Sequence, residues 1–145
     1  MPDWVSAQGG IPLESTYPYV QSSNANTAPC ASAGLPLIPI SLASDNYVSG
    51  TVLNLMGAIN QQPVTVAIAG GAAIFQHYKS GVLASSACGS NVDHAVVAVG
   101  YGSYVNGTYI KIRNSWGTSW GIGGYGLLDP NYCEILSDIY YPILN

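Results

Sequence analysis

The chain has 145 residues, of which 48% are hydrophobic and only 7% are charged. An average globular protein has roughly 25% charged residues, and a chain of this length can still bury a substantial core. Three Lys plus Arg residues and a net charge of −4 argue against nucleic acid or an anionic membrane surface as a partner. No apolar run approaches the ~20 residues that a membrane-spanning helix needs.

The first third of the chain predicts little regular structure. Trp4–Gln8 is typical of the end of a helix, which the two following glycines stop. Residues 21–33 are rich in Ser, Asn and Ala and predict a surface loop. Leu35–Ser44 contains two prolines, which favour an extended segment at the edge of a sheet.

The middle of the chain predicts short helices and strands. Apolar side chains recur at helical spacing in Thr51–Asn60, which is typical of a helix with one face in a core. Val64–Ala69 follows a proline and predicts a strand. Ala72–Gln76 predicts one further helical turn, and Tyr78–Leu83 predicts a strand or a loop.

A β-hairpin follows in the sequence. The apolar run Ala95–Val99 leads into Gly-Tyr-Gly, which predicts the end of a strand there. Asn106 and Gly107 form the dipeptide most typical of a hairpin turn. In Tyr109–Arg113 two isoleucines alternate with charged residues, which predicts a second strand with one buried face.

This hairpin brings two polar residues together. His94 begins its first strand and Asn114 follows its second, so antiparallel pairing puts both side chains at one edge of the sheet. The Asn114 side-chain oxygen can accept the proton on one imidazole nitrogen, which leaves the other nitrogen to serve a nucleophile. The structural alternative is a core histidine capped by an asparagine in an unrelated β-protein.

Two motifs resemble the papain family of cysteine peptidases. The first, D-H-A-V-V-A-V-G-Y-G, begins at Asp93, and the second, Y-I-K-I-R-N-S-W-G-T-S-W-G-I-G-G-Y-G, begins at Tyr109. The resemblance covers the C-terminal two-thirds of the mature family fold. It implies an α+β, papain-like cysteine proteinase fold, mainly the antiparallel β-barrel-like right domain. In this reading residues 46–145 form the right domain, and residues 1–45 are a remnant of the helical left domain.

The resemblance also implies roles for individual residues. His94 is expected to be the catalytic base and acid, Asn114 to orient it, and Trp116 to shield their hydrogen bond from solvent. Trp120 is expected to wall the leaving-group side of the cleft, with simple core packing as the alternative. Four residues are expected at the substrate pocket: Ala67, Asp93, Ala95 and Asp138. Asp138 is expected at the base of this pocket, where an acid favours a basic substrate side chain. The alternative is that Asp138 is an exposed residue of the tail without a role.

The three cysteines, by the same resemblance, form one disulfide and leave one residue over. Cys88 is expected to pair with Cys133, and the counterpart of Cys30 in the family pairs with a cysteine upstream of this chain's first residue. Disulfide use and the resemblance together imply a secreted, vacuolar or lysosomal location. A glycosylation sequon, Asn106–Thr108, lies at the predicted hairpin tip.

The family's nucleophile is the feature that these residues lack. It stands in a C-G-S-C-W-like segment about 130–150 residues ahead of the histidine and asparagine, whereas only 93 residues precede His94 and no such segment occurs among them. Cys30 and Cys88 are weak substitutes, because one lies in a polar loop and the other has a disulfide to form. We therefore expect an N-terminal segment or a second chain to carry the nucleophile, and this chain alone to be inactive.

The expected function of the assembled unit is that of a cysteine-type endopeptidase, which cleaves peptides or proteins through an acyl-thioester. The alternative is a non-catalytic pseudo-peptidase that binds a peptide or serves as a structural partner chain. No metal or organic cofactor is expected, because one hairpin histidine and two cysteines with another role make no metal-ligand set.

Overall fold

The computed structural model describes residues 5, 7–19 and 33–144. Contacts divide the chain into two compact units, one of residues 1–45 with 142–145 and one of residues 46–141. All residues predicted for the active site and the substrate pocket belong to the second unit. That the first unit is a remnant of a helical domain stays a prediction.

The first unit contains a small antiparallel sheet. Residues 5, 7 and 8 are helical, and Gly9 follows with a φ of +77°, the left-handed conformation that commonly stops a helix. Strand β1 (Gly10–Pro12) then pairs with β2 (Leu37–Pro39), which lies in the segment predicted to be extended. The predicted loop over residues 21–33 lies, apart from its last residue, outside the described residues.

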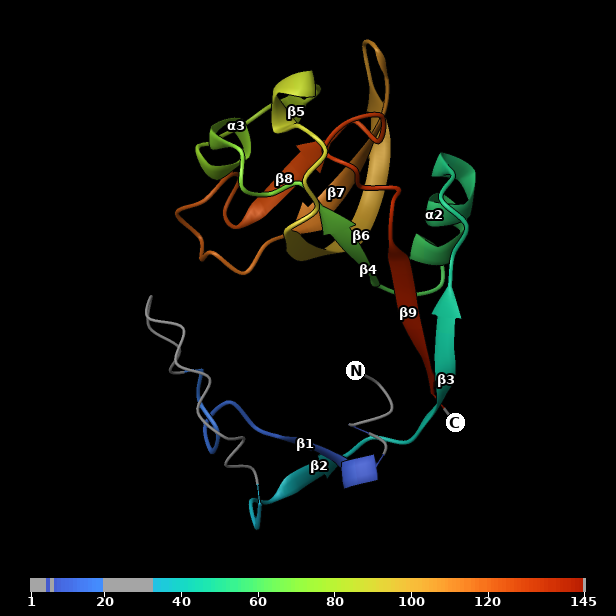
Figure 1. Ribbon diagram of the computed structural model, residues 1–145, viewed down its shortest axis with the longest axis vertical. Coiled ribbons are helices and arrows are strands. Elements are labelled where there is room, and N and C mark those ends of the chain that lie inside the picture. The colour runs from blue at the N-terminus through green and yellow to red at the C-terminus, as the bar shows by residue number, and fades with distance from the viewer. Residues whose placement is uncertain (1–4, 6, 20–32, 145) are drawn as a thin grey trace. The chain divides into compact units, whose positions relative to one another are not determined.

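A seven-stranded sheet has the order β3-β9-β4-β6-β7-β8-β5 (Figure 1), and its strands β4 to β8 belong entirely to the second unit. The strands are β3 (Leu42–Tyr47), β4 (Val64–Ile68), β5 (Val82–Leu83), β6 (His94–Tyr104), β7 (Gly107–Arg113), β8 (Tyr125–Leu128) and β9 (Ile139–Leu144). Neighbours β9-β4, β4-β6, β6-β7 and β7-β8 are antiparallel, whereas β8 and β5 are parallel. The central strands β4, β6 and β7 therefore belong to one antiparallel sheet that positions the candidate site.

Three short helical elements accompany the sheet: α2 (Val52–Ile59), α3 (Ala73–Gln76) and the 3₁₀ helix η1 (Ser86–Cys88). The hydroxyl of Thr51 caps α2 by accepting a hydrogen bond from the Asn54 N–H at 3.2 Å. Leu55 and Ala58 form the buried face of α2, which packs against β4 and β6. The helix predicted over residues 51–60 and the helical turn over 72–76 are thus confirmed.

Strand β6 is longer than predicted. It continues through Gly100 and Gly102 to Tyr104, with a β-bulge between Ala98 and Gly100, so the prediction that it ends at Gly-Tyr-Gly is wrong. Pairing with β7 satisfies the backbone beyond the glycines. At Gly102 a Cβ would lie 2.6 Å from the phenol carbon Cζ of its cross-strand partner Tyr109, so a side chain there would displace this ring.

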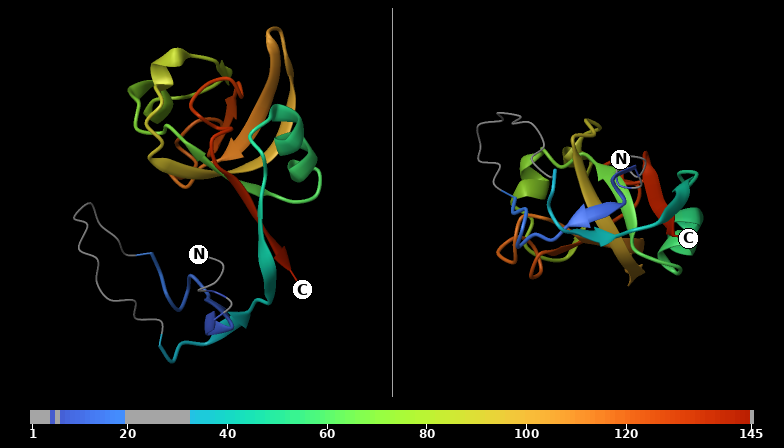
Figure 2. Two further views of the ribbon diagram at one scale, coloured as in Figure 1. Left: turned by 45° about the vertical axis from the view of Figure 1, so that its right-hand side comes forward. Right: turned by 90° about the horizontal axis from the view of Figure 1, so that it is seen from below.

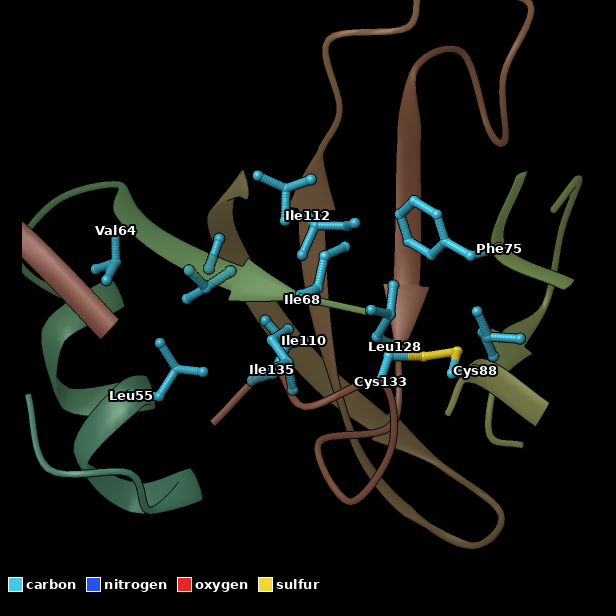
Figure 3. Packing of buried hydrophobic residues seen from close by; sticks show 14 of the residues in the cluster. Leu55, Val64, Ile68, Phe75, Cys88, Ile110, Ile112, Leu128, Cys133 and Ile135 are labelled. Atoms are coloured by element: carbon cyan, nitrogen blue, oxygen red, sulfur yellow. A yellow bond between two sulfur atoms is a disulfide. The ribbon is translucent and has the colours of Figure 1, made fainter. Parts of the chain in front are cut away.

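The second strand of the hairpin matches its prediction. Ile110 and Ile112 of β7 have no exposed surface, whereas Lys111 and Arg113 point to solvent. Such alternation gives the strand one core face. Figure 3 shows the resulting core, which runs from Leu55 of α2 to the disulfide.

The predicted disulfide joins Cys88 and Cys133 and is confirmed. Both cysteines are buried, and the bond ties η1 to the segment before β9 (Figure 3). It closes a loop with a sequence separation of 45, for which loop-closure entropy gives a stabilisation of about 4 kcal/mol. Cys30 lies outside the described residues.

Hydrogen bonds centred on the buried Asp129 hold the end of β6 to the chain after β8. The Tyr104 hydroxyl donates to Asp129, whose carboxylate also accepts the backbone and side-chain N–H groups of Asn131. Burial on its own favours a raised pKa for Asp129, but these hydrogen bonds outweigh it and hold the pKa below its ordinary value. The hydrogen bond to Asp129, assisted by burial, raises the pKa of Tyr104 to about 12.

We expect Asp129→Asn to lower the Tm by several degrees near neutral pH. A carboxyl with a lowered pKa in the folded state contributes stability above its unfolded pKa of about 3.9, and loses that contribution as the pH falls through the folded value. The difference in Tm between wild type and variant should therefore shrink below about pH 4. Thermal melts from pH 3 to 8 measure this; an equal shift for Asp45→Asn, at an exposed carboxyl, would contradict it.

Within the part of the chain that the structure describes, no helix combines the length and apolar character needed to cross a membrane.

Candidate active site

The structure brings His94 and Asn114 together. His94 is the first residue of β6, where it pairs with Ile68 at the end of β4, and Asn114 directly follows β7. The Nε2 atom of His94 lies 2.9 Å from Oδ1 of Asn114, within hydrogen-bonding distance. The contact predicted from the hairpin is present, and the catalytic roles of the two residues stay predictions.

The partners of Asn114 determine which imidazole nitrogen carries the proton. Its Oδ1 atom also accepts the backbone N–H of Ser115 at 2.8 Å, which fixes the orientation of the side-chain amide. An amide oxygen only accepts hydrogen bonds, so Nε2 of His94 is the donor. Nδ1 is then unprotonated in the neutral ring and can accept a proton from a nucleophile.

Asn114 itself is held inside the protein. Its side chain is 6% exposed, and its backbone N–H donates to the Gly124 carbonyl at 3.0 Å. Among the described residues, its Nδ2 atom has no hydrogen-bond partner. Two hydrogen bonds at Oδ1 and one at the backbone therefore position the oxygen that faces His94.

An aromatic cluster supports the histidine ring. Trp116 stacks on His94 with ring centroids 4.8 Å apart and an interplanar angle of 27°, and it remains 39% exposed. Trp120 is 5% exposed and contacts Trp116 edge-on at 5.9 Å. Trp120 is therefore mainly a packing residue beside the more exposed Trp116. Its expected role as a cleft wall stays a prediction.

Phe75 completes this cluster, and the sequence interpretation did not assign it a role. It is fully buried and contacts Trp116 at 5.5 Å and Trp120 at 5.0 Å. Its carbonyl accepts the indole N–H of Trp120 at 3.0 Å, and its ring meets the His94 ring edge-on at 6.1 Å. One sequence feature could have indicated a packing role for Phe75: it is the single phenylalanine of the chain, and it stands in a predicted helical turn.

Two glycines after β4 were also missed. The backbone N–H groups of Gly70 and Gly71 donate to Oδ1 of Asp93, at 2.9 Å and 3.0 Å. A Cβ on Gly70 would lie only 2.6 Å from the Cβ of His94. Real Cβ atoms do not approach so closely, so His94 keeps its place only because residue 70 is glycine.

The four predicted pocket residues fall into two groups. Ala67 of β4 pairs with Ala95 of β6, beside His94, and the Ala67 N–H donates to the carbonyl of Asp138 at 3.0 Å. These three residues thus lie side by side, and both Ala95 and Asp138 are exposed. Asp93, by contrast, precedes β6 and is engaged by the two glycines. A role in substrate binding stays a prediction for all four.

Over the described residues, no three His, Cys, Asp or Glu side chains are grouped so as to hold a metal ion. What the site offers is an oriented imidazole with one free nitrogen, partly covered by an aromatic ring. Such a group can remove a proton from a nucleophile and return it to a leaving group.

A β-rich domain that presents an oriented His–Asn pair is the arrangement expected of a cysteine protease. This chain belongs to the papain family of cysteine proteases, because the family described as "Papain family cysteine protease" matches residues 2–143. The resemblance inferred from the sequence motifs is thereby confirmed.

Individual cysteine proteases are similar to this chain in sequence. Papaya proteinase 4 of Carica papaya is 39% identical over an alignment of 145 positions, which covers 96% of this chain and 40% of the relative. The cysteine endopeptidase Rep1 of Oryza sativa subsp. japonica is 37% identical over an alignment of 148 positions, which covers 97% of this chain and 39% of the relative. The chain thus spans about 40% of the length of these curated relatives.

A solved structure of the bromelain protease from Ananas comosus, in complex with the E64 inhibitor, is similar to the fold. Its TM-score is 0.82 at 33% sequence identity, with 99% of this chain and 67% of that chain covered. The predicted papain-like α+β fold is therefore confirmed.

Proposed function

We propose that this chain supplies the His–Asn half of the active site of a cysteine-type endopeptidase. The observation that carries the proposal is the 2.9 Å hydrogen bond between His94 Nε2 and Asn114 Oδ1, with the amide orientation fixed by Ser115. This geometry leaves Nδ1 of the imidazole available to a cysteine thiol. Membership of the papain family supports the same chemistry.

In the proposed mechanism, Nδ1 of His94 takes the thiol proton and yields a thiolate beside an imidazolium. The thiolate attacks the peptide carbonyl, and the tetrahedral intermediate collapses as His94 gives its proton to the leaving amine. His94 then removes a proton from water, which attacks the acyl-thioester and releases the acid and the free thiol. Throughout, Asn114 keeps the ring orientation and Trp116 limits access of solvent to their hydrogen bond.

The nucleophile is proposed to come from an N-terminal segment or from a second chain. The chain covers 40% of papaya proteinase 4 and 67% of the solved bromelain chain, so these proteins contain residues that have no counterpart here. A C-x-x-C-W segment is absent from the 145 residues. The rival proposal, a non-catalytic pseudo-peptidase, retains the same sheet and aromatic cluster without any nucleophile.

The substrate is proposed to be a peptide or protein chain whose side chain on the acyl side lies near Ala67 and Ala95. Their positions on adjacent strands, with Asp138 hydrogen-bonded to Ala67 through its carbonyl, support this proposal. A carboxylate at this place favours a basic substrate side chain. A secreted, vacuolar or lysosomal location is proposed as well, and the buried disulfide supports it.

The test is a fusion of this chain behind an N-terminal papain-type segment that carries the C-G-S-C-W-like motif. We expect the fusion to hydrolyse fluorogenic peptides, and to lose this activity when the active-site cysteine of the added segment is changed to alanine. Preference for a basic over an apolar side chain should fall in an Asp138→Asn fusion. A folded fusion without peptidase activity would favour the pseudo-peptidase.

A further inference from the structure

The turn between β6 and β7 is the most exposed part of the hairpin. Val105 and Asn106 form this turn, and the Val105 side chain is 94% exposed. The tip projects beyond the rest of its compact unit in Figure 1 and in the left view of Figure 2. The tip thus presents a single exposed apolar side chain next to an exposed asparagine.

The asparagine belongs to a sequon. Asn106-Gly107-Thr108 is the only Asn-X-Ser/Thr sequence in the 145 residues. The space around the sequon is open, because a Cβ built on Gly107 meets no atom within 4 Å. Asn106 itself is exposed, so a bulky group on its side chain has room at the tip.

The disulfide provides an independent observation about the compartment. Cys88 and Cys133 are both buried and bonded, which is typical of proteins that fold in the secretory pathway. Asparagine-linked glycosylation takes place in that pathway. The exposed sequon and the disulfide thus point to the same cellular route, and neither depends on peptidase activity.

We propose that Asn106 carries an N-linked oligosaccharide that covers the hairpin tip. In the transfer, the side-chain amide nitrogen of Asn106 attacks the anomeric carbon of a lipid-diphosphate-linked oligosaccharide. A carbon–nitrogen bond forms, the bond from that carbon to the diphosphate oxygen breaks, and the lipid diphosphate leaves. The proton lost from the amide goes to a base of the transferase.

The position of the glycan is compatible with the proposed active site. His94 is the first residue of the 11-residue strand β6 and the turn follows its last residue, Tyr104. At about 3.3 Å per residue, the glycan is attached roughly 30 Å from the imidazole. The attachment site of the glycan is therefore far along the strand from His94.

The glycan also offers a physical advantage to this chain. Only 7% of its residues are charged, and a surface so poor in charge has little electrostatic protection from association. A hydrated oligosaccharide next to Val105 shields the apolar side chain that is most exposed at the tip. We therefore infer that the modification keeps the tip from associating with other molecules.

The experiment is secretory expression of the chain in eukaryotic cells, followed by peptide mapping of the total cell pool by mass spectrometry. We expect a glycopeptide at Asn106 that a peptide N-glycosidase converts to aspartate. The modification should disappear in Thr108→Val and persist in Thr108→Ser, because the sequon accepts either hydroxyl residue. An unmodified Asn106 in the wild type, or a glycan that survives in Thr108→Val, would overturn the proposal.

A second measurement tests the shielding role. Enzymatic removal of the glycan should increase self-association in light scattering, and Val105→Ser should reduce this increase. Equal scattering before and after removal of the glycan would overturn the shielding role. Self-association that Val105→Ser leaves unchanged would overturn the assignment of this side chain.

Discussion

Replacing His94 by alanine is expected to abolish peptide hydrolysis by the fusion that carries the nucleophile. Both protonation of the leaving amine and formation of the thiolate depend on this imidazole in the proposed mechanism. Loss of a catalytic histidine in a nucleophile–base pair costs roughly 10⁴–10⁶-fold in kcat. Because the proposed role lies in the chemical step, KM should change much less than kcat.

The chain offers a matched control, since it has two histidines. His77 is exposed and lies at the end of α3, where its backbone N–H donates to Ala73. His77→Ala should retain kcat within about twofold, and both variants should keep the wild-type Tm. A His94→Ala fusion that retains most of its activity would show that another group is the base.

Replacing Gly70 by alanine is expected to lower kcat about 100-fold without unfolding the protein. The new Cβ would lie 2.6 Å from Cβ, 2.9 Å from Cδ2 and 3.0 Å from Cγ of His94. These atoms are close to the backbone, so the imidazole can avoid the contact only by moving as a whole. A displacement of about 1 Å at a reacting group commonly costs 10²-fold in rate.

Gly57→Ala is the control for this substitution. Gly57 lies within α2, and a Cβ there meets no atom within 4 Å. Alanine in a helix is favoured over glycine by up to about 1 kcal/mol, so the control should be neutral or slightly more stable. The readouts are kcat and Tm measured on the same preparations. An unchanged kcat in a folded Gly70→Ala fusion would contradict the view that this glycine positions His94.

The parts of the fold that sequence predicted best are governed by local patterns. Alternation of isoleucine with charged residues in β7 correctly assigned its buried face, and helical spacing correctly located α2. The end of β6 was predicted wrongly, because glycine was taken as a stop signal. Gly102 instead makes room for the Tyr109 ring across the hairpin, a cross-strand relation that depends on the bulge and register.

The residues that support His94 and Asn114 were likewise not predictable from local sequence patterns. Asp93 is hydrogen-bonded to a backbone N–H 23 residues earlier, and Trp120 to a carbonyl 45 residues earlier. Such partners follow from the order of strands in the sheet and not from any local pattern. His94 and Asn114 were predicted as a pair because a single hairpin connects them, whereas Phe75 and Gly70 reach the site through other elements.

The central claim is that this chain contains half of a catalytic site, and the most direct test uses E64, the inhibitor bound in the solved bromelain structure. Covalent labelling is followed by peptide mapping of the chain alone, the fusion and its His94→Ala variant. We predict a label only in the fusion that retains His94, on the cysteine of the added segment. A label on Cys30 or Cys88 of the chain alone would contradict the claim, as would a folded fusion that remains unlabelled.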